Sequence, residues 1–177
     1  MSRLPGGLIE LLKDPASIKV LSTTGAEGRP HAVVKGSLTT LDDRTIALAE
    51  ELDSSVSNKN LVRSIWFDRT VAVCVTNGAV SYQIKGKPYR CLITGPVFKE
   101  FLQRARERRG ADADVAAVWI IKPLEVRDES PGVRRRVEED LRPFLNRHLD
   151  RDSIGSEPTG TRARVMSTST GGPRRVG

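Results

Sequence analysis

The sequence predicts a mainly β fold of the α+β class, a small antiparallel β-barrel with helices packed outside it. Segments with period-two alternation of apolar and polar residues follow one another, most links between them are tight turns, and helical patterns interrupt the order at few points. Short links join antiparallel neighbours, whereas each strand of a parallel sheet needs a long crossover. This order excludes a doubly wound parallel sheet and favours a barrel.

The first part of the chain supplies a short helix, three strands and a second helix. Leu8, Leu11 and Leu12 predict one or two amphipathic turns that end before Pro15. Alternation predicts strands over 17–23, 31–39 and 44–50, the last of them half-buried, with turn residues between them. The next segment has Ser54 or Ser55 as a helix N-cap, followed by apolar residues at helical spacing up to Trp66.

The second part of the chain continues the antiparallel order. Strands are predicted over 70–76, 80–85, 88–94 and 113–122, with Asn77-Gly78 as a hairpin turn and Pro123 ending the pairing of the last strand. A helix should run from Pro96 to Gly110, and another should start after Ser130-Pro131. The predicted inward face of that final helix consists of Val133, Val137, Leu141, Phe144, Leu145 and Leu149.

Length and composition predict a soluble, cytoplasmic protein with one folded domain. The chain has 177 residues, 38% hydrophobic and 29% charged. No apolar run approaches the ~20 residues that span a bilayer, so we expect no membrane association. Glu10 interrupts the short apolar stretch at the N-terminus, unlike a signal peptide. Cys74 and Cys91 lie in strand-like runs and are expected to be buried, reduced thiols. The two histidines, His31 and His148, are far apart, and we expect no metal site.

The net charge of +7 is unevenly distributed along the chain. We assign residues 1–150 to the folded domain and residues 151–177 to a disordered basic tail, because positions 155–177 carry four arginines and one glutamate among Gly, Ser, Thr and Pro. Arg104, Arg106, Arg108 and Arg109 fit the solvated face of a helix, interleaved with Glu107. Nucleic-acid binding through the tail and these arginines is a minor alternative.

The segment that starts the second helix carries the strongest functional signal. A helix start offers unpaired N–H groups and a partial positive charge, and therefore binds anions. Here these donors are joined by Ser54, Ser55, Ser57, Asn58 and Lys59, which together could hold a phosphate group. The alternative is that the serines only cap the helix, because the segment has neither GxxxxGK[ST] nor GxGxxG.

The order of these elements resembles the FMN-binding split-barrel superfamily that includes pyridoxamine 5'-phosphate oxidase. The likeness runs from about Leu4 to Val126 and includes LPG and LLK near the N-terminus, a GRPH turn, a strand with VVKGS, and SSVSNKNLVRS. It implies a six-stranded split barrel and a homodimer with FMN in a groove between the subunits. The residues implied to lie beside the flavin ring are Val33, Val34, Lys35, Gly36 and Ser37. Those implied to hold its phosphate are Ser54, Ser55, Ser57 and Asn58, with Lys35 or Lys59 as a nearby cation.

The sequence also departs from this superfamily. Val56 and Ser57 stand where many members have Arg-Lys, and the Arg-Leu-x-Pro ending of true pyridoxamine phosphate oxidases is missing, so vitamin B6 phosphate is not the expected substrate. Lys35 is the candidate for a charge near the pyrimidine end of the ring, and Tyr82 or Gln83 for a hydrogen bond to the partner's flavin. Trp119 and Asn60 are expected to be structural.

These features predict an FMN-dependent oxidoreductase that moves electrons or hydride to or from a small substrate, with catalytic residues unknown. One alternative keeps the fold but uses the deazaflavin F420 or haem. The other is a non-catalytic flavin-binding or electron-carrier module, which the absence of a clear acid or base favours.

Overall fold

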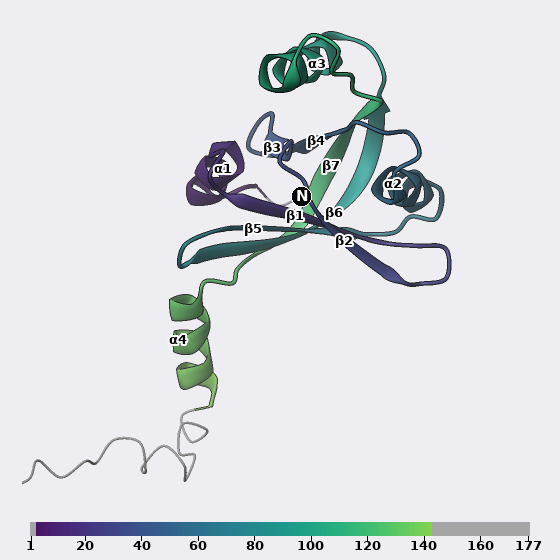
Figure 1. Ribbon diagram of the computed structural model, residues 1–177. Helices are drawn as coiled ribbons and strands as arrows, with labels where there is room; N and C mark the ends of the chain where they lie inside the picture. The colour runs from purple at the N-terminus through teal and green to yellow at the C-terminus, as the bar shows by residue number, and fades with distance from the viewer. Residues whose placement is uncertain (1–2, 143–177) are drawn as a thin grey trace, which may run out of the picture.

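An antiparallel sheet, curled into a half-barrel, forms the centre of the protein in a computed structural model that describes residues 3–142 (Figure 1). Seven strands in the described residues pair in the order β2-β1-β5-β6-β7-β4-β3. Their bounds are β1 Ile18–Thr24, β2 Pro30–Val34, β3 Thr39–Thr40, β4 Ile46–Glu50, β5 Val71–Asn77, β6 Val80–Leu92 and β7 Ala117–Asp128. The helices there are α1 Gly6–Lys13, α2 Val56–Trp66, α3 Pro96–Arg109 and α4 Pro131–Leu141. The predicted split-barrel fold class is confirmed.

The number of strands differs from six because the chain turns within the predicted strand 31–39. Leu38 N donates to Lys35 O at 3.1 Å, and this turn separates β2 from the two-residue strand β3. Lys35 N still donates to Lys19 O at 2.8 Å, so the pairing of β2 with β1 extends to the turn. The turn places Lys35, Gly36 and Ser37 at one end of the sheet, beside the end of β4.

A long two-stranded ribbon, β6 with β7, joins the two halves of the sheet. The predicted separate strands 80–85 and 88–94 are one strand, because a register shift at Gly86 bends the chain without ending its pairing. A Cβ at Gly86 would lie 2.7 Å from Ile121 Cγ2 and 2.8 Å from Lys122 O, so only glycine fits this bend. Pro123 pairs opposite Gly86 inside β7 and does not end that strand, contrary to the prediction.

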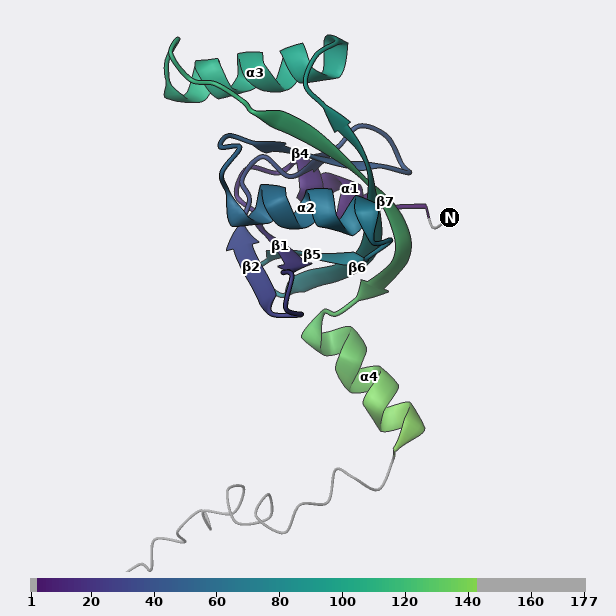
Figure 2. The ribbon, with the colours of Figure 1, turned by 90° about the vertical axis from the view of Figure 1, so that its right-hand side faces the viewer.

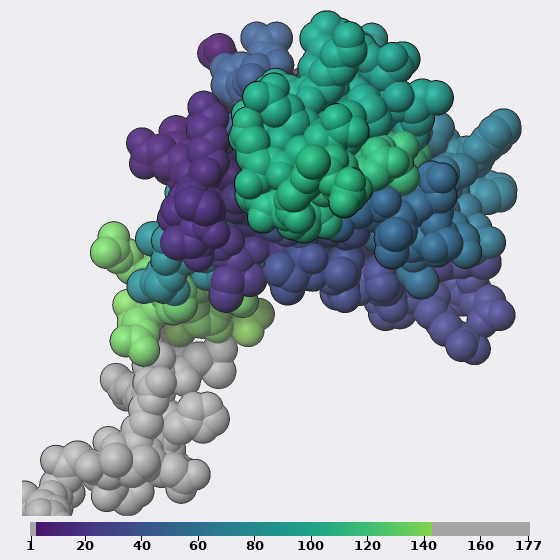
Figure 3. Space-filling view, turned by 45° about the horizontal axis from the view of Figure 1, so that its top comes forward, coloured from purple at the N-terminus to yellow at the C-terminus, as the bar shows by residue number. Residues whose placement is uncertain are grey.

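Two apolar clusters cover the two faces of the sheet. The larger lies inside the curl and includes Leu8, Leu21 and Trp119. The second lies between β4, β7 and α3, where Phe101 packs near Ala47. Strand β4 is therefore buried on both faces and not half-buried as predicted, because α3 covers its outer face. Figure 3 shows α3 over this end of the molecule, between α1 and α2.

The helices begin where the sequence predicts, but α4 does not pack as predicted. Ser55 is the N-cap of α2, and α3 runs from Pro96 to its C-cap at Gly110. Helix α2 lies along one side of the curled sheet, whereas α4 extends away from it (Figure 2). Val133, Val137 and Leu141, predicted to face inward, are 38%, 50% and 74% exposed because no described element lies against them.

Several predictions fall outside the described residues: the rest of that apolar face, Phe144, Leu145 and Leu149, together with His148, the domain boundary at residue 150 and the tail 151–177. Within residues 3–142, none of the helices has both the length and the apolar character needed to cross a membrane.

Candidate functional site

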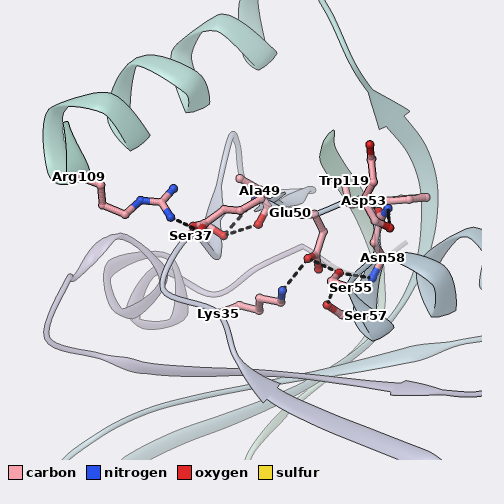
Figure 4. Close-up of polar contacts among 11 residues, drawn as sticks. Lys35, Ser37, Ala49, Glu50, Asp53, Ser55, Ser57, Asn58, Arg109 and Trp119 are labelled. Atoms are coloured by element: carbon pink, nitrogen blue, oxygen red, sulfur yellow. Dashed lines mark hydrogen bonds and ion pairs between the residues drawn. The ribbon is translucent and has the colours of Figure 1, made fainter. Parts of the chain in front are cut away.

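The start of α2 and the turn after β2 meet at a buried carboxylate. Ser55 caps α2 by accepting a hydrogen bond from Asn58 N at 3.0 Å, and its own Oγ donates to Glu50 Oε2 at 2.9 Å. Lys35 Nζ lies 2.7 Å from the same oxygen (Figure 4). Two donors and the positive end of a helix therefore surround one anionic group. We call Lys35, Ser55 and the first turn of α2 the anion cradle.

Glu50 is the residue of this site that sequence reasoning missed. Its side chain is 1% exposed at the end of β4, whereas that of Lys35 is 15% exposed. The second carboxylate oxygen, Oε1, is buried and has no hydrogen-bond partner among the described residues. A buried polar atom without a partner is uncommon and destabilising, which points to a role beyond folding.

A pocket of about 350 Å³ opens beside the cradle. Residues from the turn after β2, the end of β4, the loop that follows it and the end of α3 line the pocket: Val34, Lys35, Gly36, Ser37, Ala49, Glu50, Glu51, Leu52, Ser55, Arg108 and Arg109. Five of the ten predicted cofactor residues are in this lining, namely Val34, Lys35, Gly36, Ser37 and Ser55. The structure thus brings the predicted ring segment and the predicted cap together at one cavity.

The other five predicted residues lie elsewhere. Val33 packs against the inner core, while Ser54 and Lys59 are exposed away from the pocket lining. Ser57 is buried, with its Oγ 3.3 Å from Ser55 Oγ. Both ends of the Asn58 amide form hydrogen bonds within the chain: Nδ2 donates to Asp53 O at 3.1 Å, and Oδ1 accepts from Trp119 Nε1 at 2.8 Å. The amide of Asn58 therefore fixes the first turn of α2 to the core.

Ser37 holds the turn after β2 in place. Its Oγ donates to Ala49 O at 2.9 Å and accepts from Ala49 N at 3.1 Å. Both bonds join the turn to β4, the strand that carries Glu50 (Figure 4). This hydroxyl therefore positions the pocket wall, and its hydrogen is already donated to Ala49 O.

Charges of both signs line the pocket. Arg108 and Arg109, predicted as part of a solvated helix face, lie at its edge, and Arg109 forms an ion pair with Glu51. The lining then contains three basic side chains, including Lys35, and two acidic ones. Such a lining suits a ligand with an anionic group, provided that the group can approach Lys35 in spite of Glu50.

A second lysine lies next to Lys35 in the sheet. Lys19 is 5% exposed on β1 and lines a smaller hollow of about 250 Å³, which shares Gly36, Ser37 and Arg108 with the main pocket. Burial lowers the pKa of Lys19, the charge of Asp14 opposes that shift, and Arg108 adds to it. The two hollows together are lined by six basic and three acidic side chains, so basic groups predominate at this end of the sheet.

Aromatic and thiol side chains lie away from the pocket lining. Trp119 is 1% exposed in the core, as predicted. Tyr82 packs on the inner core, and Gln83, on the other face of β6, lies opposite Cys74 of β5. Cys74 is half-buried and Cys91 exposed, so the prediction of two buried thiols is wrong; both are free, as predicted. Cys91 lies near the end of β6, paired opposite Trp119 of β7.

Few of the described residues are suited to acid–base catalysis or metal binding. His31 is half-buried on β2, opposite Thr23, and does not line the pocket. Asn60 Nδ2 donates to Thr23 Oγ1 at 3.1 Å, so its predicted structural role is confirmed. Residues 3–142 hold no cluster of three or more His, Cys, Asp or Glu side chains that could bind a metal ion.

Comparisons with known proteins identify the fold. No protein-family model matches the chain, and a search of curated proteins finds no match either. Among solved structures, HupZ from Group A Streptococcus matches with a TM-score of 0.60 at 18% identity, over 72% of this chain and 95% of that one. An FMN-binding protein from Syntrophomonas wolfei matches with a TM-score of 0.57 at 16% identity, over 70% and 82%.

An F420 reductase matches with a TM-score of 0.53 at 19% identity, over 70% of this chain and 98% of that chain. Two further matches are chains provisionally named pyridoxamine 5'-phosphate oxidases. These likenesses confirm, at the level of fold, the predicted resemblance to the pyridoxamine 5'-phosphate oxidase-like split barrel.

Proposed function

We propose that this split-barrel protein binds FMN at the pocket beside the anion cradle and uses it in electron or hydride transfer with a small substrate. The observation that carries the proposal is the convergence of Lys35 and Ser55 on an anionic group, the Glu50 carboxylate, in the lining of that pocket. The fold is shared with an FMN-binding protein, which supports the choice of cofactor. When bound, the flavin supplies the redox chemistry, and the protein supplies position and charge.

The residues beside the pocket offer the hydrogen-bond donors and positive charges that the phosphate of FMN needs. Lys35 offers an ammonium group, Ser55 a hydroxyl and the first turn of α2 its partial positive charge, while Arg108 and Arg109 add charge at the edge of the pocket. Of the two roles that the sequence suggested for Lys35, this geometry supports the one at the phosphate end of the cofactor and not the one at the pyrimidine end. Val34 and Gly36, both exposed in the pocket wall, are the residues that the ring would contact.

A homodimer is part of this proposal. The end of α2 and the turn after it expose Ile65, Trp66 and Phe67 at 41%, 80% and 66%. Exposed apolar groups of this kind are typical of protein interfaces. Light scattering at micromolar concentration should give twice the chain mass, and Trp66→Ser should shift the mass toward the monomer.

A fluorescence titration tests the choice of FMN. FMN emission should be quenched at micromolar protein, and Lys35→Met should weaken binding about tenfold or more because it removes the ammonium from the cradle. Lys59→Met is the matched control, since Lys59 is exposed outside the pocket lining, and it should change the affinity less than about twofold. Absence of quenching with all three proteins would refute the assignment.

F420 is the second candidate cofactor, because an F420 reductase shares this fold. The same titration with F420 separates the two cofactors, and tighter binding of F420 than of FMN would reverse the assignment. A binding module without turnover is supported by the lack of histidine and cysteine in the pocket lining. Stopped-flow reduction by nicotinamide nucleotides distinguishes that module from an oxidoreductase.

A further inference from the structure

The carboxylate of Glu50 lies where the cradle would hold an external anion. Its Oε2 accepts from Lys35 Nζ and Ser55 Oγ, the two cradle side chains that also line the pocket. Short, charge-assisted hydrogen bonds of this kind hold phosphate and carboxylate oxygens alike. The cradle is therefore filled by a group of the same chain (Figure 4).

The other oxygen of Glu50 shows that this arrangement is not optimal for folding alone. Oε1 is buried without a partner among the described residues, although Glu50 lines a pocket. A carboxylate kept only for stability would have both oxygens hydrogen-bonded. A phosphate group that approached Lys35 would also meet the negative charge of Glu50 at close range, which opposes binding.

We propose that Glu50 is an internal competitor for the anion cradle, so that a phosphate group binds to Lys35 and Ser55 only when the carboxylate leaves them. This rests on the proposed function for the identity of the phosphate ligand, FMN, but the competition itself is a property of Glu50 and the cradle. The affinity for phosphate is then lower than it would be if Lys35 and Ser55 were free, and the strength of their bonds to Glu50 determines how much lower.

Glu50→Gln tests this competition, because it removes the charge and keeps the shape. Glu51→Gln is the matched control: Glu51 lines the same pocket and the variant loses the same charge, but its side chain is 48% exposed and pairs with Arg109, not Lys35. Inorganic phosphate, followed by calorimetry and thermal shift, is the first probe. FMN and riboflavin, which differ by the phosphate, are the second.

Glu50→Gln should bind inorganic phosphate and FMN about tenfold more tightly than the native protein, with riboflavin unchanged. Glu51→Gln should gain less than about threefold, because its charge is better screened. Lys35→Met in the Glu50→Gln background should abolish the gain. If Glu50→Gln does not fold, as judged by circular dichroism, Glu50→Met fills a similar volume without a carboxylate and should show the same gain.

Equal phosphate affinity in the native protein and in a folded Glu50 variant would overturn the proposal. An equal gain in Glu51→Gln would overturn it too, since the effect would then be one of general charge. If no variant binds either flavin while phosphate binding still increases on replacing Glu50, the FMN assignment fails and the competition stands. If FMN binds but replacing Glu50 changes nothing, the competition fails and the FMN assignment stands.

Discussion

Replacing Lys35 by Met should destabilise the protein by about 3 kcal/mol. The substitution removes the ammonium group that lies 2.7 Å from Glu50 Oε2 and leaves a carboxylate that is only 1% exposed. Glu50 would keep the Ser55 hydroxyl alone, because Oε1 has no partner among the described residues. Breaking a buried ion pair from one side costs about 3–5 kcal/mol, and the 15% exposure of Lys35 places this pair at the lower end.

Replacing the other member of the pair, Glu50, should reduce the stability by less. Glu50→Leu leaves an ammonium group that can reach water, so we expect a loss of about 1–2 kcal/mol. Lys35→Met combined with Glu50→Leu should return to within about 1 kcal/mol of the native stability, because an apolar pair can replace a buried ion pair at little cost. The double-mutant cycle then gives a coupling energy of at least about 3 kcal/mol.

Urea unfolding followed by circular dichroism measures all four proteins, with equal slopes showing that the unfolded states are comparable. A loss below about 0.5 kcal/mol for Lys35→Met, with additive effects in the double variant, would refute the view that these side chains form a buried pair.

Three further predictions concern positions outside the cradle. Gly86→Ala should cost about 2 kcal/mol or more in urea unfolding, because its Cβ meets Ile121 and the Lys122 carbonyl, whereas Gly132→Ala on α4, with open space around it, should be neutral or slightly stabilising. Lys19→Met should stabilise the protein by about 1 kcal/mol at pH 7, because burial lowers the pKa of Lys19 in the folded state. The stability of the native protein therefore increases as the pH is raised toward 10.5, and melting curves at several pH values should show the advantage of the Met variant shrinking. Desolvation raises the pKa of the Cys91 thiol, so iodoacetamide should label it slowly at pH 7 and about tenfold faster per pH unit below that pKa, as mass spectrometry with Cys91→Ser as control can establish.

Local signals in the sequence were sufficient for most element boundaries. A cap such as Ser55, a Pro at the start of a helix and a Gly after its end act within one turn, so the positions of α2 and α3 follow from nearby residues. The alternating segments likewise predicted the succession of strands along the chain, and hence the fold class, but not the place of β4 beside β7 in the sheet. The prediction that Pro123 ends the pairing of the last strand was wrong, because Pro123 pairs opposite Gly86, a residue far away in the sequence.

The candidate site could be predicted only in part. The turn after β2 and the cap of α2 each have a recognisable sequence, and both line the pocket. Glu50 has no such signal, since its partner lies 15 residues away on another segment and becomes a neighbour only through the sheet. The burial of β4 on both faces and the place of Arg108 and Arg109 at the pocket edge depend on how α3 packs, which no local pattern encodes.

The two tryptophans of this chain make it its own optical reporter. Trp66 is 80% exposed on the single chain, so in the monomeric form a water-soluble quencher such as iodide should suppress its emission first. The remaining signal would come from Trp119, whose indole N–H is bonded to Asn58 in the opening turn of α2. A shift in the wavelength of that residual emission would register movement of the turn as it happens, without any added dye.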